Sequence, residues 1–305
     1  PWSEAVIVPI YKKGDANVTA NYRGISLLNL LGKCYTSILN NRLYSWLEDS
    51  SKIIDSQAGF RKGYSTTDHI FTLYAVTQKY LLKRGGKLYV AFIDLKIAFD
   101  SIRRSTMLGC LKRVGISSKF LNAIMGIYQK VVSCVRINNE LTEMFDCPKG
   151  LRQGCCLSPT IFSVIINEVA VRVSEDGRHG IQMMPGFIEL LIMLFADDIA
   201  LMSFSPSGLQ SQLDLLNTLC TDLDLSINSD KSKIMVFRHG GYLSKYEKWY
   251  IDGCPLEVVN NYIYLGYKFT TTMSSIETAK HLAVKGRHAT YNTIRAYNQL
   301  QNMTS

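Results

Sequence analysis

The stretch from Phe187 to Phe204, FIELLIMLFADDIALMSF, decides how this sequence folds around its most unusual residues, Asp197 and Asp198. It has the length of a membrane-spanning helix. However, each central carboxylate would cost about 2.5–3.5 kcal/mol inside a bilayer, even on a lenient insertion scale. Two apolar strands, at about 190–195 and 199–204, explain the stretch better, because a tight turn between them carries both aspartates. The sequence therefore predicts a buried hairpin with acid at its tip.

Strands and helices are interspersed on both sides of this hairpin. Apolar runs that end in turn residues predict strands over residues 5–11, 22–27 and 88–94, with a basic turn after the first. Helical spacing of apolar residues predicts helices over residues 32–47 and 70–82, a basic helix capped by Asp100 or Ser101, and an apolar helix from Ser158 to about Val173. The mixture is typical of an α+β fold. With no linker or repeat, we expect one body and a possible change of subdomain near residue 270.

The composition is that of a globular protein and suggests a polyanionic partner. The chain has 305 residues, 47% hydrophobic and 19% charged, which excludes a disordered or collagen-like chain. Its net charge is +9, and the surplus is confined to residues 51–150, which hold 16 basic and 7 acidic side chains against 18 of each elsewhere. A nucleic acid is therefore the first partner to test.

The cysteines and the N-terminus indicate a reducing compartment. Eight cysteines include no C-x-x-C pair and the five histidines lack zinc-finger spacing, so we expect no zinc site. Scattered thiols fit an intracellular protein. The first residues, PWSEAV, resemble neither a signal peptide nor a transit peptide and lack an initiator methionine, as expected of a fragment.

Three carboxylates suggest the chemistry. Asp94 ends a predicted buried strand, and Asp197 and Asp198 lie at the hairpin tip, where a bare charge is costly. A divalent cation would compensate it, because Mg²⁺ needs only one or two protein carboxylates plus phosphates and waters. Two such ions about 3.5–4 Å apart form the clamp used for nucleotidyl transfer. The alternatives are a salt-bridged surface turn for the aspartate pair and a helix cap for Asp100.

Seven ordered blocks from about Val8 to Gly266 resemble the reverse transcriptases of non-LTR (LINE-type) retrotransposons. Three of them are similar to the family's motifs A, B and C: FID at 92–94 with AFD at 98–100, GLRQG at 150–154 with LSP at 157–159, and FADD at 195–198. The flanking blocks are YRGISLL at 22–28, QAGFR at 57–61, Ile227-Asn228 through Lys231, and YLG at 264–266. The resemblance implies an RNA-directed DNA polymerase that extends a primer 3′-hydroxyl with deoxynucleotides.

The same resemblance assigns roles to individual residues. Asp94 and Asp197 would bind two Mg²⁺ ions, for which Mn²⁺ is a possible substitute, with the Leu95 carbonyl and Asp198 supporting the site. Lys12, Lys13 and Arg23 would hold the triphosphate, and Gln153 and Gly154 would contact the nucleotide. Phe99 would exclude a ribose 2′-hydroxyl, and Lys231 would protonate the departing pyrophosphate. Tyr264, Leu265 and Gly266 would form the primer grip. Ordinary core, turn and surface roles remain the alternatives for the residues outside the carboxylate set.

The implied architecture is the fingers and palm of a right-hand polymerase, with an antiparallel palm sheet backed by helices. Fingers would take about residues 1–88 with parts of 101–150, and the palm about 89–100 and 150–270. Residues 271–305 would begin a helical thumb that is cut short. The implied partners are an RNA template, a DNA primer, the RNA/DNA hybrid and deoxynucleotides, without a membrane and with an open oligomeric state. The expected location is the cytoplasm and nucleus.

Two other functions stay open. Cys156, Gly24, Ile97 and Ser232 differ from the family's commonest residues, so the chain could be an inactive nucleic-acid-binding remnant of such an element. A group II intron-type or telomerase-type polymerase shares the catalytic motifs and differs only in the flanking blocks.

Overall fold

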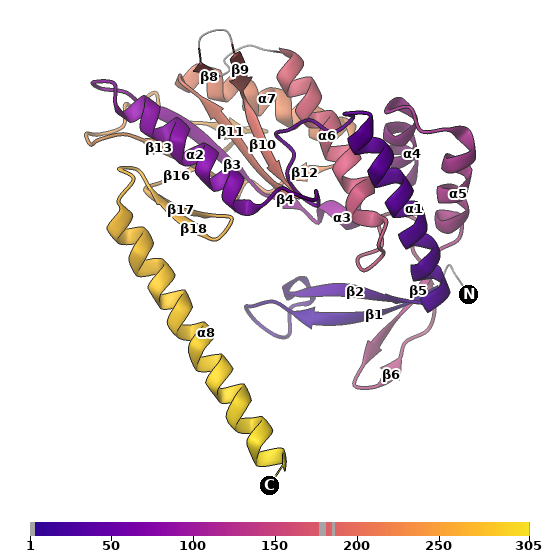
Figure 1. The fold of residues 1–305 in the computed structure, drawn as a ribbon. Coiled ribbons are helices and arrows are strands. Elements are labelled where there is room, and N and C mark those ends of the chain that lie inside the picture. Colours follow the sequence, from indigo (N-terminus) through magenta and orange to yellow (C-terminus); the bar gives the residue numbers. More distant parts are fainter. Residues whose placement is uncertain (1–3, 177–180, 185–186, 305) are drawn as a thin grey trace.

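The computed structural model describes residues 4–176, 181–184 and 187–304, which form a mixed sheet-and-helix body with one projecting helix (Figure 1). The helices are α1 Leu30–Asp49, α2 Thr66–Leu81, α3 Ala98–Ser101, α4 Arg104–Arg113, α5 Ser118–Tyr128, α6 Ser158–Asp176, α7 Pro206–Asp222 and α8 Ser275–Thr304, with a 3-10 turn at Thr19–Asn21. The strands are β1 Glu4–Tyr11, β2 Tyr22–Leu28, β3 Leu88–Ile93, β4 Leu95–Lys96, β5 Val132–Ile137, β6 Glu140–Leu141, β7 Phe145–Asp146, β8 Ile181–Met184, β9 Phe187–Leu190, β10 Ile192–Phe195, β11 Asp198–Ser203, β12 Ser226–Ile227, β13 Lys233–Phe237, β14 Tyr250–Ile251, β15 Cys254–Pro255, β16 Glu257–Val259, β17 Asn261–Tyr264 and β18 Tyr267–Thr270. The predicted α+β class is confirmed.

The central sheet has the strand order β10-β11-β3-β13-β16. Its pairs are antiparallel except at one edge, where β16 runs parallel to β13. The predicted acidic hairpin is confirmed as β10 and β11, with Phe195 paired to Asp198 across a two-residue turn. Leu190 belongs to the preceding strand β9, so the first strand of the hairpin is shorter than predicted.

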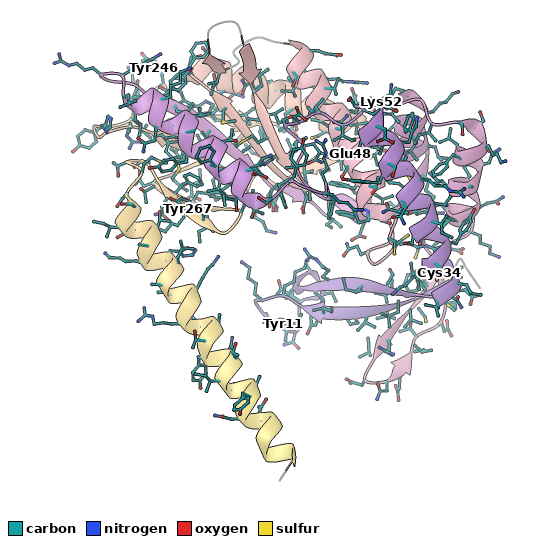
Figure 2. The ribbon with its side chains drawn as sticks, viewed as in Figure 1. Tyr11, Cys34, Glu48, Lys52, Tyr246 and Tyr267 are labelled. Carbon is teal, nitrogen blue, oxygen red and sulfur yellow. The ribbon has the colours of Figure 1, made fainter. Side chains whose placement is uncertain are left out.

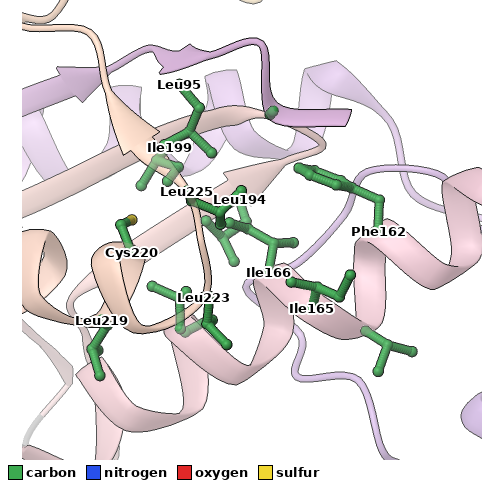
Figure 3. Close-up of a cluster of buried hydrophobic side chains, with 14 of the residues drawn as sticks. Leu95, Phe162, Ile165, Ile166, Leu194, Ile199, Leu219, Cys220, Leu223 and Leu225 are labelled. Atoms are coloured by element: carbon green, nitrogen blue, oxygen red, sulfur yellow. The ribbon is translucent and has the colours of Figure 1, made fainter. Parts of the chain in front are cut away.

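The sheet separates two apolar cores because its residues alternate between faces. On one face, β3 residues such as Ala91 and Ile93 pack with α6 and α7. Figure 3 shows this core, where Ile166 of α6 and Cys220 of α7 meet Leu194 and Ile199 of the acidic hairpin. On the other face, Val90 and Phe92 pack with α2 and the β17–β18 hairpin. Both faces of the acidic hairpin are therefore covered by apolar packing.

A second sheet carries the N-terminal hairpin. β1 and β2 pair antiparallel from Ala5 with Leu28 to Tyr11 with Tyr22, and β1 pairs in parallel with β5. The predicted strands and the basic turn between them are thus confirmed. Tyr11 lies at the free end of this hairpin, which extends under the central sheet (Figures 1 and 2).

The C-terminal helix α8 is joined to the body at the β17–β18 hairpin. Thr278 of α8 is buried and donates its hydroxyl to the Lys268 carbonyl, and Lys268 pairs with Glu277. Beyond this contact the helix projects away from the body and remains largely exposed (Figure 1). The expected helical segment after residue 270 is therefore present.

Two local predictions differ from the structure. Asp100 and Ser101 do not cap the basic helix; they lie inside the short helix α3, and Arg103 is the N-cap of α4. The helix predicted from residue 70 begins earlier, at Thr66, because Ser65 and Asp68 form a capping box. The described helices include none that is long and apolar enough to cross a membrane.

Candidate active site

The three predicted metal-binding carboxylates come together at one end of the central sheet. Ile199 of β11 pairs with Ile93 of β3, so Asp198 and Asp94 are the next residues on neighbouring strands. Side chains alternate along strands, which directs both toward the face of Phe92 and Ala200. Ala196 adopts a φ of 59°, so the chain reverses within two residues and leaves Asp197 at the tip.

The negative charges of Asp94, Asp197 and Asp198 repel one another. Burial, and after it the negative charges of Asp197 and Asp94, together raise the pKa of Asp198 to about 6. Burial, and after it the charges of Asp198 and Asp94, raise the pKa of Tyr262 to about 12. The site therefore has a negative potential that a cation would relieve.

Asp94 is oriented by the segment that follows β12. The Asn228 side-chain amide donates to Asp94 Oδ2 at 3.1 Å, and the Asp94 backbone N–H donates to Ser232 Oγ at 3.1 Å. Lys231 Nζ lies 3.9 Å from the same Oδ2, so the predicted Lys231 is part of the site. Asn228 was not among the predicted site residues, although it stands in a block that resembled the family.

The donor set suits magnesium better than zinc. Among the described residues there is no group of three or more His, Cys, Asp or Glu side chains arranged to hold a metal by themselves. The aspartates supply hard oxygen donors, and 38% of the Asp94 side chain is exposed, so substrate can reach it. Mg²⁺ needs few protein ligands because substrate phosphates and waters complete its shell. Leu95 is buried in β4, and a part for its carbonyl stays a prediction.

The loop 150–154 joins the N-terminal hairpin to the carboxylate region. Gln153 donates its side-chain amide to Asp100 Oδ2 at 2.8 Å, and its carbonyl accepts from Ser26 N at 2.7 Å. Gly154 has a φ of 111°, and a Cβ there would lie 2.6 Å from the Ser26 carbonyl oxygen. Gly154 thus permits a close contact between two protein segments, and its predicted contact with a nucleotide stays a prediction.

Asp100 connects the predicted phosphate-binding residues to this loop. Burial raises the pKa of Asp100, while the hydrogen bond from Gln153 and the charges of Lys12 and Arg23 act in the opposite direction. Lys12 and Arg23 therefore lie near Asp100, and Lys13 follows in the same basic turn. Lys12, Arg23 and Gln153 therefore share one neighbourhood around Asp100.

A cavity of about 180 Å³ lies behind the same loop. Arg104 and Arg152 line it and donate to main-chain carbonyls, Arg104 to Tyr128 and Cys147 and Arg152 to Ile127. Burial lowers the pKa of both guanidinium groups. The Arg152 bond ties the loop 150–154 to the end of α5, and the two Arg104 bonds tie α4 to the same region.

Phe99 is fixed between two other phenylalanines. Its ring stacks on Phe162 of α6 at 4.4 Å between centroids and meets the edge of Phe60 at 6.4 Å. Ile97, with a φ of 48°, reverses the chain after β4 so that α3 presents Phe99 beside the loop 150–154. The Leu151 N–H donates to the Phe99 carbonyl at 2.7 Å. The ring is therefore held rigidly, as a steric filter requires.

The predicted primer grip is a tight turn on the other side of the carboxylates. Leu265 and Gly266 both have positive φ angles, 47° and 89°, which forms a two-residue turn between β17 and β18. Tyr264 is buried, and its hydroxyl lies 3.4 Å from Nδ1 of His69 on α2. The His69 ring also meets the edge of Phe195 at 6.1 Å. His69, which the sequence did not single out, thus links the turn to the acidic hairpin.

His69 gives a pH-dependent prediction. Burial lowers its pKa to about 4, so between pH 6.5 and 4 the unfolded chain binds a proton that the folded chain does not. The free energy of unfolding should therefore decrease as the pH is lowered through this window, by roughly 3 kcal/mol once the pH is below about 4. Chemical denaturation of the wild type and His69→Gln at pH 7 and pH 4.5 should show a smaller loss for the variant. Equal losses would mean that other groups control the acid sensitivity.

Residues 56–60 form a second support of the acidic hairpin. Ala58 N donates to the Leu194 carbonyl at 2.9 Å, and Leu194 N donates to the Ser56 carbonyl at 2.8 Å. A Cβ at Gly59 would lie 2.1 Å from the Ala196 nitrogen, so only glycine fits against the turn. The QAGFR block resembled the family, but its contact with the hairpin needed the tertiary structure.

Comparison with known families and proteins gives matches over most of the chain. Residues 10–269 match the family model described as reverse transcriptase (RNA-dependent DNA polymerase). The probable RNA-directed DNA polymerase from transposon BS of Drosophila melanogaster is 28% identical over 240 residues, 76% of this chain and 25% of that protein. The Pol polyprotein from a type-1 retrotransposable element R2 of Popillia japonica is 26% identical over 293 residues, 93% of this chain and 40% of that protein. The chain thus spans less than half the length of these relatives.

Solved structures of similar shape include telomerases. Apo telomerase from Candida tropicalis, truncated from its C-terminal domain, superposes with a TM-score of 0.59 over 90% of this chain and 54% of that one. The sequence identity is 12%, so this likeness concerns the fold alone.

Proposed function

The chain belongs to the reverse transcriptase family and is a domain of the non-LTR retrotransposon type, and from this premise we propose that it copies RNA into DNA by extending a primer 3′-hydroxyl with deoxynucleotides. The observation that carries the proposal is the convergence of Asp94, Asp197 and Asp198 at the end of β3 and the β10–β11 turn. Asn228 and Lys231 beside Asp94 support it.

The proposed roles follow from the chemistry of each group. Asp94 and Asp197 hold Mg²⁺ with the help of the Leu95 carbonyl, while Asp198 supports the site from beside them. When bound, two such ions activate the attacking hydroxyl and stabilise the departing pyrophosphate. Lys231, as a cation within reach of Asp94, can supply a proton to the leaving group.

The nucleotide is expected against the loop 150–154. Lys12, Lys13 and Arg23 offer positive charge for the triphosphate, and Gln153 positions this loop through Asp100. Phe99 faces the sugar and excludes a 2′-hydroxyl. On the opposite side, the turn of Tyr264, Leu265 and Gly266 supports the primer end.

The division of the chain is also proposed from the family resemblance. Fingers comprise about residues 1–88 with parts of 101–150, the palm about 89–100 and 150–270, and the thumb starts at about 271. The separate N-terminal sheet and the projecting helix α8 support this division. We also propose, from the family resemblance, that the protein acts in the cytoplasm and nucleus.

Primer extension tests the proposal directly. The chain should extend a DNA primer annealed to an RNA template when deoxynucleotides and Mg²⁺ are present, and a chelator should stop synthesis until Mg²⁺ is restored. Because phosphate contacts dominate affinity, template binding should weaken steeply as salt rises. Extension that survives complete chelation would contradict the metal assignment. Salt-sensitive RNA binding without any extension would instead identify an inactive nucleic-acid-binding remnant.

A further inference from the structure

Phe60 is an exposed aromatic residue held in an unfavourable backbone conformation. Phe60 is 47% exposed, whereas Gln57, Ala58 and Gly59 before it are buried. Its φ is 64°, a left-handed conformation that is rare for a bulky residue. Such strain persists only where the surroundings impose it, and it concentrates at functional sites.

The chain on both sides of Phe60 is firmly attached. On the N-terminal side, Gly59 fits against the Ala196 backbone of the catalytic hairpin. On the C-terminal side, Arg61 makes a two-fold contact with Glu48, at 2.8 Å for each bond, and donates to the carbonyls of Ile54 and Gln57. The contacts of Gly59 and Arg61 therefore fix the position of the Phe60 ring, which is itself only partly buried.

The position of the ring relates it to the reacting centre. One edge contact joins it to Phe99, at 6.4 Å and an interplanar angle of 89°. Asp197 is only one residue beyond Ala196, the residue that Gly59 touches. Phe60 therefore stands beside both the residue proposed to face the sugar and the hairpin that carries the carboxylates.

The surroundings of Phe60 suit a base with a backbone phosphate nearby. Arg61, the residue after Phe60, forms an ion pair with Glu48. Its guanidinium group is therefore not available to bind a phosphate beside the Phe60 ring. Lys62, two residues further, is exposed and offers a positive charge. The triphosphate of an incoming nucleotide is already expected at Lys12 and Arg23. A template strand supplies both a flat base and a separate phosphate at this place.

We propose that the exposed ring of Phe60 is a stacking platform for a template nucleobase at or next to the position being copied. This proposal rests on the proposed function, because it requires an RNA template in the site. Stacking on an aromatic face tolerates any base, which a polymerase needs in order to copy every sequence. The strain at Phe60 and its rigid attachment keep the platform in place without closing it off.

Binding experiments with abasic templates test the proposal. Affinity for an RNA template with an annealed, chain-terminated DNA primer is measured for the wild type, Phe60→Ala, Phe60→Gly and Phe60→Trp. We expect Phe60→Ala and Phe60→Gly to bind about 5- to 100-fold more weakly, the range that loss of one base–aromatic stack implies, and Phe60→Trp to keep the affinity. Phe71→Ala, at an exposed phenylalanine of α2, is the matched control and should bind like the wild type.

The decisive experiment measures binding to templates that lack a single base. When the template is abasic at the stacking position, the wild type and Phe60→Ala should bind equally, whereas an abasic site several nucleotides away should preserve their difference. Phe60→Gly, which accommodates the positive φ, should melt at a temperature no lower than the wild type, and this separates stacking from folding.

Three results would overturn the proposal. If the affinity difference between the wild type and Phe60→Ala is the same at every abasic position, Phe60 is a packing residue. A difference between the wild type and Phe60→Ala that appears only after the next matched deoxynucleotide is added to the binding mixture would assign the ring to that nucleotide instead. Wild-type affinity in Phe60→Ala would remove any role in binding. Because these measurements need no synthesis, failure of extension would refute the proposed function separately.

Discussion

Asp197→Asn should lower the rate of RNA-templated synthesis by at least about 10³-fold, close to abolition, because metal stabilisation of developing charge contributes several kcal/mol to such reactions. The substitution keeps the size of the side chain but removes its charge. The residue lies at a two-residue turn fixed by Ala196 and Gly59, so the backbone should not move. Single-turnover extension with saturating deoxynucleotide measures the effect.

Template binding and stability give the controls for this substitution. Since Asp197 adds to the repulsion felt by Asp198, Asp197→Asn should melt at a temperature equal to or above that of the wild type without metal. Mg²⁺ should raise the melting temperature of the wild type more than that of the variant. Asp222→Asn, at an exposed aspartate that ends α7, should leave synthesis unchanged. Synthesis retained by Asp197→Asn would show that this carboxylate is not a metal ligand.

Phe99→Val should reduce the preference for deoxynucleotides over ribonucleotides by about 10²-fold, as estimated from the size of specificity changes in tight pockets. The aromatic ring is stacked on Phe162 and makes a T-shaped contact with Phe60, so we expect that it cannot turn aside to admit a 2′-hydroxyl. Valine removes most of that obstacle. The ratio of kcat/KM for a matched deoxynucleotide and ribonucleotide measures the effect.

A control must separate this effect from loss of packing. Phe237→Val, in the other core of the sheet, should lower the melting temperature but leave the ratio of the two kcat/KM values unchanged. If Phe99→Val also leaves that ratio unchanged, Phe99 is a core residue and sugar selection lies elsewhere.

Local signals in the sequence were sufficient where one segment determines its own structure. The apolar runs and the turn residues of the acidic hairpin predicted β10 and β11 to within two residues, because a buried two-strand unit needs only local pairing and apolar side chains. The cap of α4 was mispredicted. Asp100 looks like a cap residue, but its carboxylate accepts a hydrogen bond from Gln153, which is 53 residues away in sequence.

The sequence by itself determined the α+β class, the acidic hairpin and the identity of the three carboxylates, because these depend on hydrophobic pattern and residue type. Tertiary structure decided which groups surround them. Asn228 reaches Asp94 across 134 positions, and His69 reaches Tyr264 across 195. Side-chain partners so distant in the chain leave no periodic signal, since their contact arises only when the strands of the central sheet are paired and packed.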